Sequence, residues 1–439
     1  ASDLQRHPMA LLGARAVAIG LVVLAALTVY GVRRLSILDE RDAVDRLRGR
    51  VVRGAMSTLG ATFIKLGQVM STRPDLFPPG FIAELRLLQD ELPPFSAGAA
   101  RARIEDELGQ PADAIFIELD EAPLAAASVA QVHRGRLRAT GEEVAVKVLR
   151  PDVRQKTERD GAILMAFAEL AMRLSEIARH ADFAGHAAHF LEGVLAQTDL
   201  TVEAANYERF RANFAAVEGI RFPRVYPEAS GRTVMTMDLV RGRKVDALRP
   251  EDDTPAIARR LRRAFLKMLF EDGFLHADLH PGNMLVDDGG NVAIFDVGLA
   301  TALSDELLEY YIDFNKCLVL GTAPDFVEHL RRYHSYVEGR VDWDELARDV
   351  EDMVGAFRGK SASELEFGAM IERTFAVGRK YEVRPFPEMT LIMVGLVTAE
   401  GIGKQLAPEL DSFSEVASYL MPILARRGML PVGAPMSAG

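Results

Sequence analysis

The sequence predicts an α+β protein with two lobes and an additional helical segment on its N-terminal side. In residues 114–150 apolar residues no longer recur at helical spacing. They alternate with polar residues in short runs, as is typical of strands. From Ile257 onward apolar residues recur at helical spacing, interrupted by one short hairpin pattern. A chain of 439 residues is also long for one hydrophobic core, so two or three packed units are expected.

The composition is that of a folded, acidic protein, with 49% hydrophobic and 26% charged residues. The 52 Lys and Arg residues are outnumbered by 63 Asp and Glu residues, and the formal net charge is −11. We therefore expect no nucleic-acid partner, because such a protein needs a basic face. The single cysteine, Cys317, cannot form an internal disulfide, and no Cys/His cluster has zinc-finger spacing. Both facts favour a reducing compartment and disfavour a structural zinc site.

Residues 1–34 form a first segment whose centre, Ala16 to Val32, is apolar and uncharged. As a helix this stretch is about 25 Å long, slightly short of the ~30 Å hydrocarbon core, so spanning requires Arg15 to extend toward the headgroups. A helix in the membrane interface and a buried helix are alternatives, while a signal peptide lacks its small-residue cleavage site. Basic residues are more frequent after this segment than before it, which predicts a cytoplasmic location for the remainder.

Residues 35–112 are predicted to form a helical extension. Apolar residues recur at three-to-four spacing in VVRGAMSTLGATFIKLGQVMS, and prolines mark the turns between helices. Residues 113–242 are predicted to form the smaller lobe, in which AIFIEL, SVAQVHRGRL and EVAVKVL give three antiparallel strands. Helices follow over 152–217, and RVYPEASGRTVMTMDLV is predicted to contain two more strands.

Residues 243–425 are predicted to form a helix-rich lobe. Its one hairpin is expected in NMLVD and NVAIFD, joined by a turn at Gly289 and Gly290. The stretch 237–242, MDLVRG, is expected to link the two lobes. Residues 426–439 are expected to be a loose tail.

Four polar side chains supply the groups that phosphoryl transfer requires. Lys147 ends the apolar run VAVK, and Asp278 and Asn283 lie five residues apart in HADLHPGN. Asp296 directly follows the strand-like run NVAIF. Phosphoryl transfer uses a cation on the phosphates, an acid at the reacting end, and hard oxygen ligands for Mg²⁺. The pattern therefore predicts a site for ATP and Mg²⁺ between two lobes.

These residues also have plainer interpretations. A solvated strand end explains Lys147 alone, and Asp278 could cap the turn before Pro-Gly. His276 and His280 could be structural histidines, or they could bind a transition metal together with Asp278. The order and spacing of all the groups favour phosphoryl transfer over each alternative.

The motifs VAVK, HADLHPGN and DVG have the order and spacing of the protein-kinase strand lysine, catalytic loop and metal-binding motif. Together with KLGQ at 65–68 and LAAASVAQVH at 124–133, they resemble the UbiB (AarF) family of atypical kinase-like proteins. The similarity extends from about Thr62 to Leu410. It implies a bilobal protein-kinase-like fold with an N-terminal helical extension and a helix-rich C-lobe.

The resemblance assigns roles to the central residues. It implies that Asp278 orients or deprotonates the attacking hydroxyl or water, and that Asn283 and Asp296 hold magnesium. It implies that Glu203, in LTVEAANYERF, pairs with Lys147, although a lone helix glutamate is otherwise usually solvated.

The resemblance also points to residues around the nucleotide. An alanine-rich loop (Ala125, Ala126, Ala127, Ser128) replaces the Gly-rich phosphate loop, so the phosphates must be gripped differently. The linking stretch supplies Met237 and Leu239 as weaker candidates for nucleotide contact. In similar proteins the extension folds across the active site.

Two sequence motifs typical of the family are related to the N-terminal extension. One is the motif containing Lys65, Gly67 and Gln68, whose lysine could also be an ordinary surface residue. The other is a Glu-x-Asp pair shortly before the helix glutamate, in which this chain keeps Asp199 but has Gln197 in place of the first acid. The metal motif likewise departs from the usual form, with Val297 in place of Phe.

Two classes of function follow from the resemblance. The first is an ATP- and Mg²⁺-dependent atypical kinase or ATPase that supports ubiquinone or other isoprenoid lipid biosynthesis, membrane-associated and with its catalytic domain in the cytoplasm. The second is a nucleotide-binding scaffold for lipids or other lipid-biosynthesis enzymes, with little phosphoryl transfer. A Ser/Thr protein kinase acting in trans ranks below both. The expected partners are nucleotide, a lipid or membrane surface, and other lipid-biosynthesis enzymes.

Overall fold

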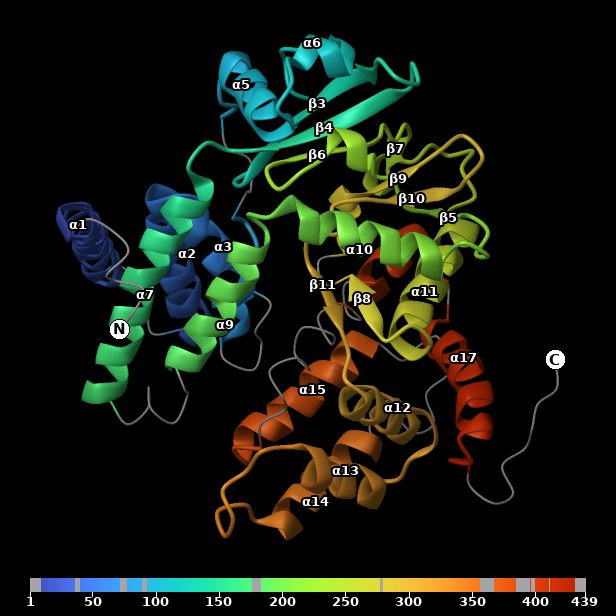
Figure 1. The fold of residues 1–439 in the computed structure, drawn as a ribbon. Helices are drawn as coiled ribbons and strands as arrows, with labels where there is room; N and C mark the ends of the chain where they lie inside the picture. The colour runs from blue at the N-terminus through green and yellow to red at the C-terminus, as the bar shows by residue number, and fades with distance from the viewer. Residues whose placement is uncertain are drawn as a thin grey trace. The chain divides into compact units, whose positions relative to one another are not determined.

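The computed structural model describes residues 9–35, 40–71, 77–88, 93–175, 183–276, 279–355, 367–383, 395, 399–409 and 411–430. The chain divides into two compact units (Figure 1). The first consists of Ala1–Ala212 and Pro223–Val240, and the second of Asn213–Phe222 and Arg241–Gly439. The chain passes into the second unit after Val240, within the stretch predicted to link the lobes.

Helices make up most of the first unit. They are α1 (Met9–Arg34), α2 (Arg41–Leu59), α3 (Ala61–Ser71), α4 (Pro79–Leu85), α5 (Ala97–Leu108), α6 (Ala112–Ile115), α7 (Val153–Leu174), α9 (Phe183–Ala196) and α10 (Leu200–Asn213, whose last residue falls in the second unit). The extension predicted over 35–112 is accordingly helical where the structure describes it.

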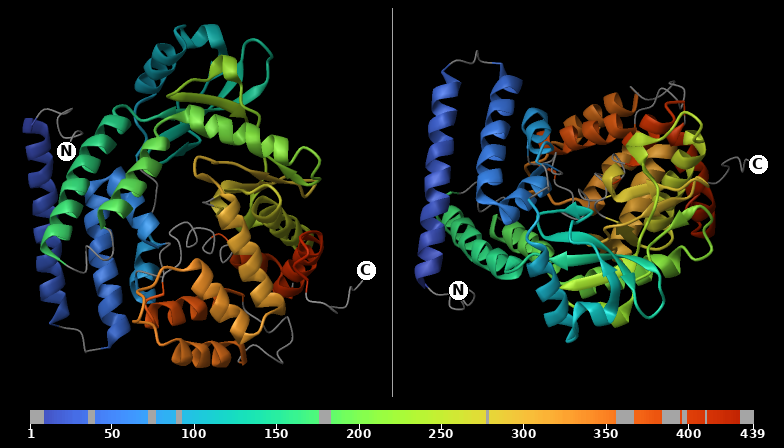
Figure 2. Two further views of the ribbon diagram at one scale, coloured as in Figure 1. Left: turned by 60° about the horizontal axis from the view of Figure 1, so that its bottom comes forward. Right: turned by 90° about the horizontal axis from the view of Figure 1, so that it is seen from above.

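The extension helices share a hydrophobic core with α1 and α7. Buried residues such as Phe63, Leu85 and Ile163 meet there. The α1 helix is fixed to this core by Arg15, whose Nε donates to Asp160 Oδ1 on α7 at 2.7 Å and whose Nη2 donates to the Leu59 carbonyl at 2.7 Å. Figure 2 shows α1 and α2 side by side along their lengths.

An antiparallel sheet forms the rest of the first unit, in the order β1-β3-β4-β6 with β2 paired to β3. Its strands are β1 (Phe116–Leu119), β2 (Ala125–Ala126), β3 (Ala130–Leu137), β4 (Glu143–Leu149) and β6 (Val234–Asp238). Side chains alternate across β4, so Val144, Val146 and Val148 enter one core with α5 while Lys147 points to the opposite face. The three strands predicted over 114–150 are therefore confirmed.

The prediction of two strands in RVYPEASGRTVMTMDLV was half wrong. The second strand is β6, but the first is reduced to an isolated bridge between Val225 and Met237, followed by the short helix η2 (Pro227–Ala229). Pro227 has no N–H to donate to a ladder, and its fixed φ suits the start of a helical turn.

The second unit is mostly helical. Its helices are α11 (Thr254–Phe270), α12 (Asp305–Leu320), α13 (Ala323–Tyr333), α14 (Trp343–Gly355), α15 (Phe367–Lys380) and α17 (Ser412–Arg426), with short turns η3 (Val245–Ala247) and η4 (Pro281–Asn283). Its strands are β5 (Ile220–Arg221), β7 (Arg243–Lys244), β8 (Phe274–His276), β9 (Met284–Val286), β10 (Val292–Ile294) and β11 (Ala300–Ala302). They form the sheets β5-β10-β9-β7 and β11-β8.

The predicted hairpin at 283–296 is confirmed as β9 and β10. Asp287 Oδ1 accepts hydrogen bonds from the N–H groups of Gly289 and Asn291, each at 2.9 Å, and Gly290 takes the positive φ of +72° that the turn requires. The hairpin fixes the ends of its two strands opposite one another.

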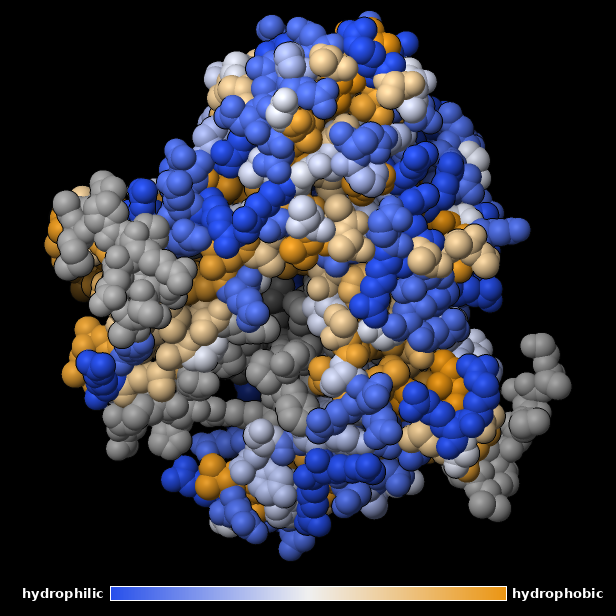
Figure 3. Space-filling model, in the orientation of Figure 1, coloured by the Kyte–Doolittle hydropathy of each residue, from blue (hydrophilic) through white to orange (hydrophobic). Residues whose placement is uncertain are grey.

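Helix α1 is longer than the predicted stretch of 16–32, and Leu12–Arg34 is long and apolar enough to cross a membrane. One side of α1 packs inward through Leu12 and Ile19. On the opposite side Leu21, Leu24 and Leu27 are each more than 60% exposed. Orange surface appears at the left edge of Figure 3, where α1 lies in Figure 1. Helix α1 therefore carries a continuous apolar face that the first unit does not cover.

Gly49 on α2 is expected to be required for packing against α4. A Cβ atom at this position would lie 2.8 Å from both the Phe81 carbonyl oxygen and Glu84 Cβ, so the two helices would have to separate. We expect Gly49→Ala to lower the free energy of unfolding by about 1–3 kcal/mol. Gly54 on the same helix has open space around it, and Gly54→Ala should raise stability by up to about 1 kcal/mol. Urea unfolding of the purified chain, followed by circular dichroism, measures both; equal effects would contradict the close packing.

Candidate active site

Lys147 and Glu203 form a largely buried ion pair within the first unit. Lys147 Nζ lies 2.8 Å from both carboxylate oxygens of Glu203, and the side chains are 15% and 6% exposed. Strand alternation directs Lys147 away from the valine core, and Glu203 lies in the first turn of α10. The glutamate inferred from the family pattern thus lies against the strand lysine, although 56 residues separate them.

The alanine-rich loop is held by its backbone. Ala125 and Ala126 pair with β3, and the N–H of Ala127 donates to the Ala130 carbonyl at 2.8 Å. Arg150, which follows β4, donates from Nε to the Ala127 carbonyl at 2.8 Å. No residue from 124 to 130, a stretch described throughout, has a positive φ, so the loop adopts conformations that alanine accepts readily.

Ser128 of this loop is 1% exposed, and its Oγ has no hydrogen-bond partner among the residues that the structure describes. A buried hydroxyl without a partner is costly, so a partner from outside the chain would stabilise it. The polar end of a bound ligand could serve.

The predicted motif on the extension lies on α3. Gly67 is buried, and a Cβ atom there would be 2.6 Å from Met56 Sδ and closer still to Leu88. Lys65 and Gln68 are half-buried on the same helix. Glycine in this motif is therefore explained by close packing of α2, α3 and the chain after α4.

Asp199 organises the start of α10. Its Oδ1 accepts from Thr201 N and Oγ1 at 3.2 and 2.6 Å, and its Oδ2 accepts from Arg232 Nε at 2.9 Å. Burial opposes ionisation, but the hydrogen bonds from Thr201 and the Arg232 guanidinium together lower the pKa of Asp199. Asp199 thereby steadies the helix turn that carries Glu203. Gln197 is half-buried just before it.

The candidate adenine contacts, Met237 and Leu239, lie at the end of β6. Met237 is buried and paired with Ala145 of β4, and Leu239 follows the strand and is half-buried. Neither side chain is fully exposed, which is consistent with the weak role that we assign to them.

Sequence reasoning missed the residues that anchor the extension to the sheet. Gln131 of β3 is fully buried; its Oε1 accepts from Phe95 N at 3.1 Å, and its Nε2 lies 2.8 Å from His133 Nε2. His133 Nδ1 in turn lies 2.8 Å from the Asp120 carbonyl. The signal was present in SVAQVH, because strand alternation places both polar residues at buried positions.

In the second unit, Asn283 and Asp296 lie at the open end of the β9–β10 hairpin. Met284 pairs with Ile294, so the next positions outward are Asn283 and Phe295, and Phe295 N donates to the Asn283 carbonyl at 3.0 Å. Asp296 is exposed and has a positive φ of +58°, while Val297 behind it is completely buried. The hairpin thus places a buried amide, Asn283, and an exposed carboxylate, Asp296, at one edge.

The loop before the hairpin is described in part. His276 is buried in β8, which pairs with β11. His280 caps η4, with its Nδ1 accepting from Gly282 N at 3.0 Å, which supports the structural interpretation of this histidine. Asp278 lies outside the described residues.

The chemistry of these groups fits nucleotide and magnesium. A lysine ammonium held by a carboxylate matches phosphate oxygens, and the amide and carboxylate oxygens of Asn283 and Asp296 are the hard donors that Mg²⁺ prefers. Lys147 and Glu203 belong to the first unit, whereas Asn283 and Asp296 belong to the second.

The chain is similar to known protein families and to known proteins over most of its length. A family model described as the ABC1 atypical kinase-like domain matches residues 87–329, and one described as the UbiB helical domain matches residues 350–411. A relative named "Probable protein kinase UbiB", from Aeromonas salmonicida (strain A449), is 33% identical over 390 residues, covering 86% of this chain and 70% of the relative. One of the same name from Pseudomonas paraeruginosa (strain DSM 24068 / PA7) is 33% identical over 398 residues, covering 87% and 72%.

A solved structure, "The complex structure of Rv3197-erythromycin from Mycobacterium tuberculosis", has the same fold, with a TM-score of 0.56 and 18% identity over 85% of this chain and 95% of that chain. The fold and the family-model match define a kinase-like protein of the atypical class. More particularly, the chain belongs to the UbiB family. The predicted family and the predicted α+β kinase-like fold are both confirmed.

Loss of the Lys147–Glu203 pair should destabilise the first unit. We expect Glu203→Ala to lower the free energy of unfolding by about 3 kcal/mol, because it leaves a largely buried ammonium group without its carboxylate. Glu208→Ala on the same helix removes an exposed pair with Arg211 and should cost less than about 1 kcal/mol. Denaturant unfolding of both variants, with Lys147→Met and the double variant Lys147→Met/Glu203→Ala, gives the coupling energy. Additive losses in that cycle would argue against a direct interaction.

Proposed function

We propose that this chain is an ATP- and Mg²⁺-dependent atypical kinase or ATPase that supports ubiquinone or other isoprenoid lipid biosynthesis at a membrane. The Lys147–Glu203 pair carries the proposal, since a kinase-like site needs an ammonium group positioned on the phosphates. The ubiquinone link comes from the relatives named UbiB.

Each residue has a defined task in this proposal. Lys147, oriented by Glu203, neutralises phosphate charge, and Asn283 and Asp296 would hold Mg²⁺, which supplies charge stabilisation at the transferred group. Asp278 orients the attacking hydroxyl or water. The alanine-rich loop, fixed by Arg150, closes over the phosphates without the close backbone approach that glycines allow.

A nucleotide-binding scaffold with little phosphoryl transfer is the second candidate. The extension that carries Lys65, the alanine-rich loop and the amide at Gln197 support it, since a loop without glycine approaches phosphate less closely and Gln197 replaces the first acid of the family's Glu-x-Asp pair. A protein kinase acting in trans is the third candidate, and it alone predicts transfer of labelled phosphate to an added protein.

Phosphate release from ATP tests the proposed enzyme. We expect the purified chain, with Mg²⁺ and anionic liposomes, to release phosphate, and Asp296→Asn to reduce the rate on the order of 100-fold because a metal-binding charge is lost. Lys65→Ala should raise the rate, because the extension is proposed to restrict the site. Asp288→Asn, in the turn at the other end of the same hairpin, should leave the rate unchanged. Nucleotide binding without release above the Asp296→Asn level would favour the scaffold.

Membrane association is proposed to depend on the exposed apolar face of α1. Leu24→Asp places a charge on this face and should weaken binding to anionic vesicles by about 2–3 kcal/mol, roughly a 30- to 150-fold loss. Val337→Asp, at an exposed apolar residue of the second unit, is the control and should bind like wild type. Vesicle flotation measures both. Equal flotation of Leu24→Asp and wild type would show that another surface holds the membrane.

A further inference from the structure

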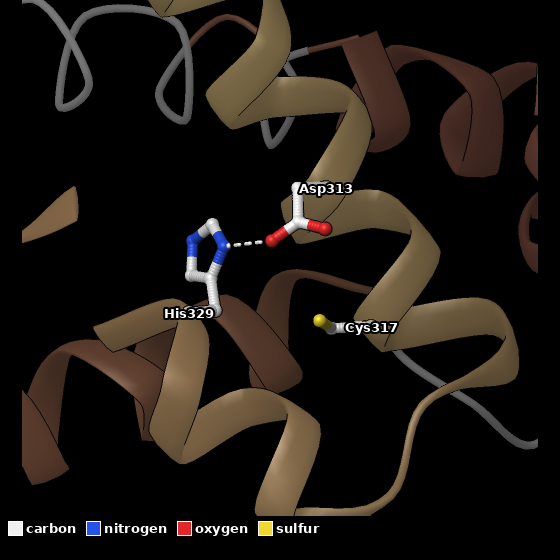
Figure 4. Close-up of side chains that lie close together, drawn as sticks. All are labelled: Asp313, Cys317 and His329. Atoms are coloured by element: carbon white, nitrogen blue, oxygen red, sulfur yellow. Dashed lines mark hydrogen bonds and ion pairs between the residues drawn. The ribbon is translucent and has the colours of Figure 1, made fainter. Parts of the chain in front are cut away.

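A cluster of three potential metal ligands lies in the second unit, separate from the kinase-like residues. Asp313 and Cys317 are four residues apart on α12, so they share one face of the helix, and His329 faces them from α13 (Figure 4). Asp313 Oδ2 is 3.0 Å from His329 Nδ1. One ligand atom from each of the three residues lies within 4.8 Å of the other two.

The cluster is buried in an aromatic environment. Cys317 is 4% exposed and His329 1% exposed. The His329 ring packs against Tyr310, Phe314 and Tyr333, with ring centroids 4.5 to 5.6 Å apart. A carboxylate in such surroundings is costly unless it is paired, and here it is paired with His329 and with Lys316 Nζ at 3.3 Å.

We propose that Asp313, Cys317 and His329 form a binding site for a divalent transition-metal ion, for which Zn²⁺ is the best chemical match. Sulfur, imidazole nitrogen and carboxylate oxygen are the donors that zinc takes in proteins, whereas magnesium and calcium prefer oxygen alone. One thiolate, one carboxylate and a neutral imidazole together carry a charge of −2 and offset that of the ion, which suits a buried site. A water molecule would complete the tetrahedron.

Binding needs only small rearrangements. Ligand atoms around tetrahedral zinc lie about 3.5 Å apart, so pairs up to 4.8 Å apart must approach by about 1.3 Å at most, while Asp313 Oδ2 and His329 Nδ1, now 3.0 Å apart, must separate by about 0.5 Å. The thiol releases its proton to solvent as the sulfur–metal bond forms. The imidazole proton moves from Nδ1 to Nε2, which frees the Nδ1 lone pair for the metal. His329 Nε2 has no hydrogen-bond partner in the described part of the chain, so the change both breaks the bond to Asp313 and leaves a buried N–H without an acceptor, and the bonds to the metal must offset both costs.

The Cys317 side chain is a neutral thiol in the metal-free protein, because burial raises its pKa to about 12. Metal binding must therefore displace its proton. A bound cation would reverse this balance, as metal coordination deprotonates thiols. The ion would also cross-link α12 to α13.

Titration with Co²⁺ tests the site, because Cys317 is the only cysteine in the chain. The full-length protein, without a histidine tag and stripped by a chelator, should develop one thiolate-to-cobalt charge-transfer band in the near ultraviolet, and Zn²⁺ should abolish it. The band should disappear in Cys317→Ser, and the Co²⁺ affinity should fall at least ~10-fold in His329→Gln. Glu309→Gln removes an exposed carboxylate one turn earlier on α12 and should leave the titration unchanged.

Thermal unfolding separates loss of a ligand from loss of the fold. Zn²⁺ should raise the melting temperature of wild type and of Glu309→Gln, and should leave that of a folded Cys317→Ser or His329→Gln protein unchanged. Absence of both the cobalt band and the zinc-dependent shift in wild type would overturn the proposal and identify a metal-free, hydrogen-bonded core cluster. This result would stand even if the variants failed to fold.

Discussion

The ion pair between Lys147 and Glu203 is the interaction on which the arrangement of the first unit depends. A largely buried ammonium is stable only with a carboxylate against it, and here that carboxylate comes 56 residues later. The intervening chain, which includes α7 and α9, packs on the extension before it returns to the sheet as α10. The placement of Glu203 against Lys147 therefore depends on how α7 and α9 pack on the extension.

The two faces of the sheet have different tasks, because side chains alternate between them along each strand. One face of β4 contributes three valines to the core, while the other carries Lys147. Arg150, just beyond the strand, holds the Ala127 carbonyl, and Gln131 on the neighbouring strand holds the backbone of Phe95. The strand lysine, the alanine-rich loop and the base of the extension are thus fixed by groups on two adjacent strands. Hydrogen bonds thus hold the loop in place without glycine.

The features predicted correctly from the sequence depend on residues that lie close together in the chain. The central strands, the hairpin and the pairing of Asn283 with the end of β10 follow from alternation and turn residues within a few positions of one another. The first strand predicted in RVYPEASGRTVMTMDLV is reduced to an isolated bridge, because Pro227 cannot donate to a ladder and begins the short helix η2. The cluster of Asp313, Cys317 and His329 was beyond prediction, because its spacing matches no zinc motif and only the packing of α13 on α12 brings it together.

The backbone at Asp296 gives a further argument about the hairpin. A positive φ costs a non-glycine residue on the order of 1 kcal/mol, and glycine would remove that cost. The Asp296 residue is exposed, and the buried contact at this end of β10 comes from Val297. Aspartate accepts this conformation more readily than most residues, so the chain can turn at the end of β10 with a carboxylate at the turn. The proposed magnesium site uses this carboxylate together with the amide of Asn283, which lies on the adjoining strand at the same edge.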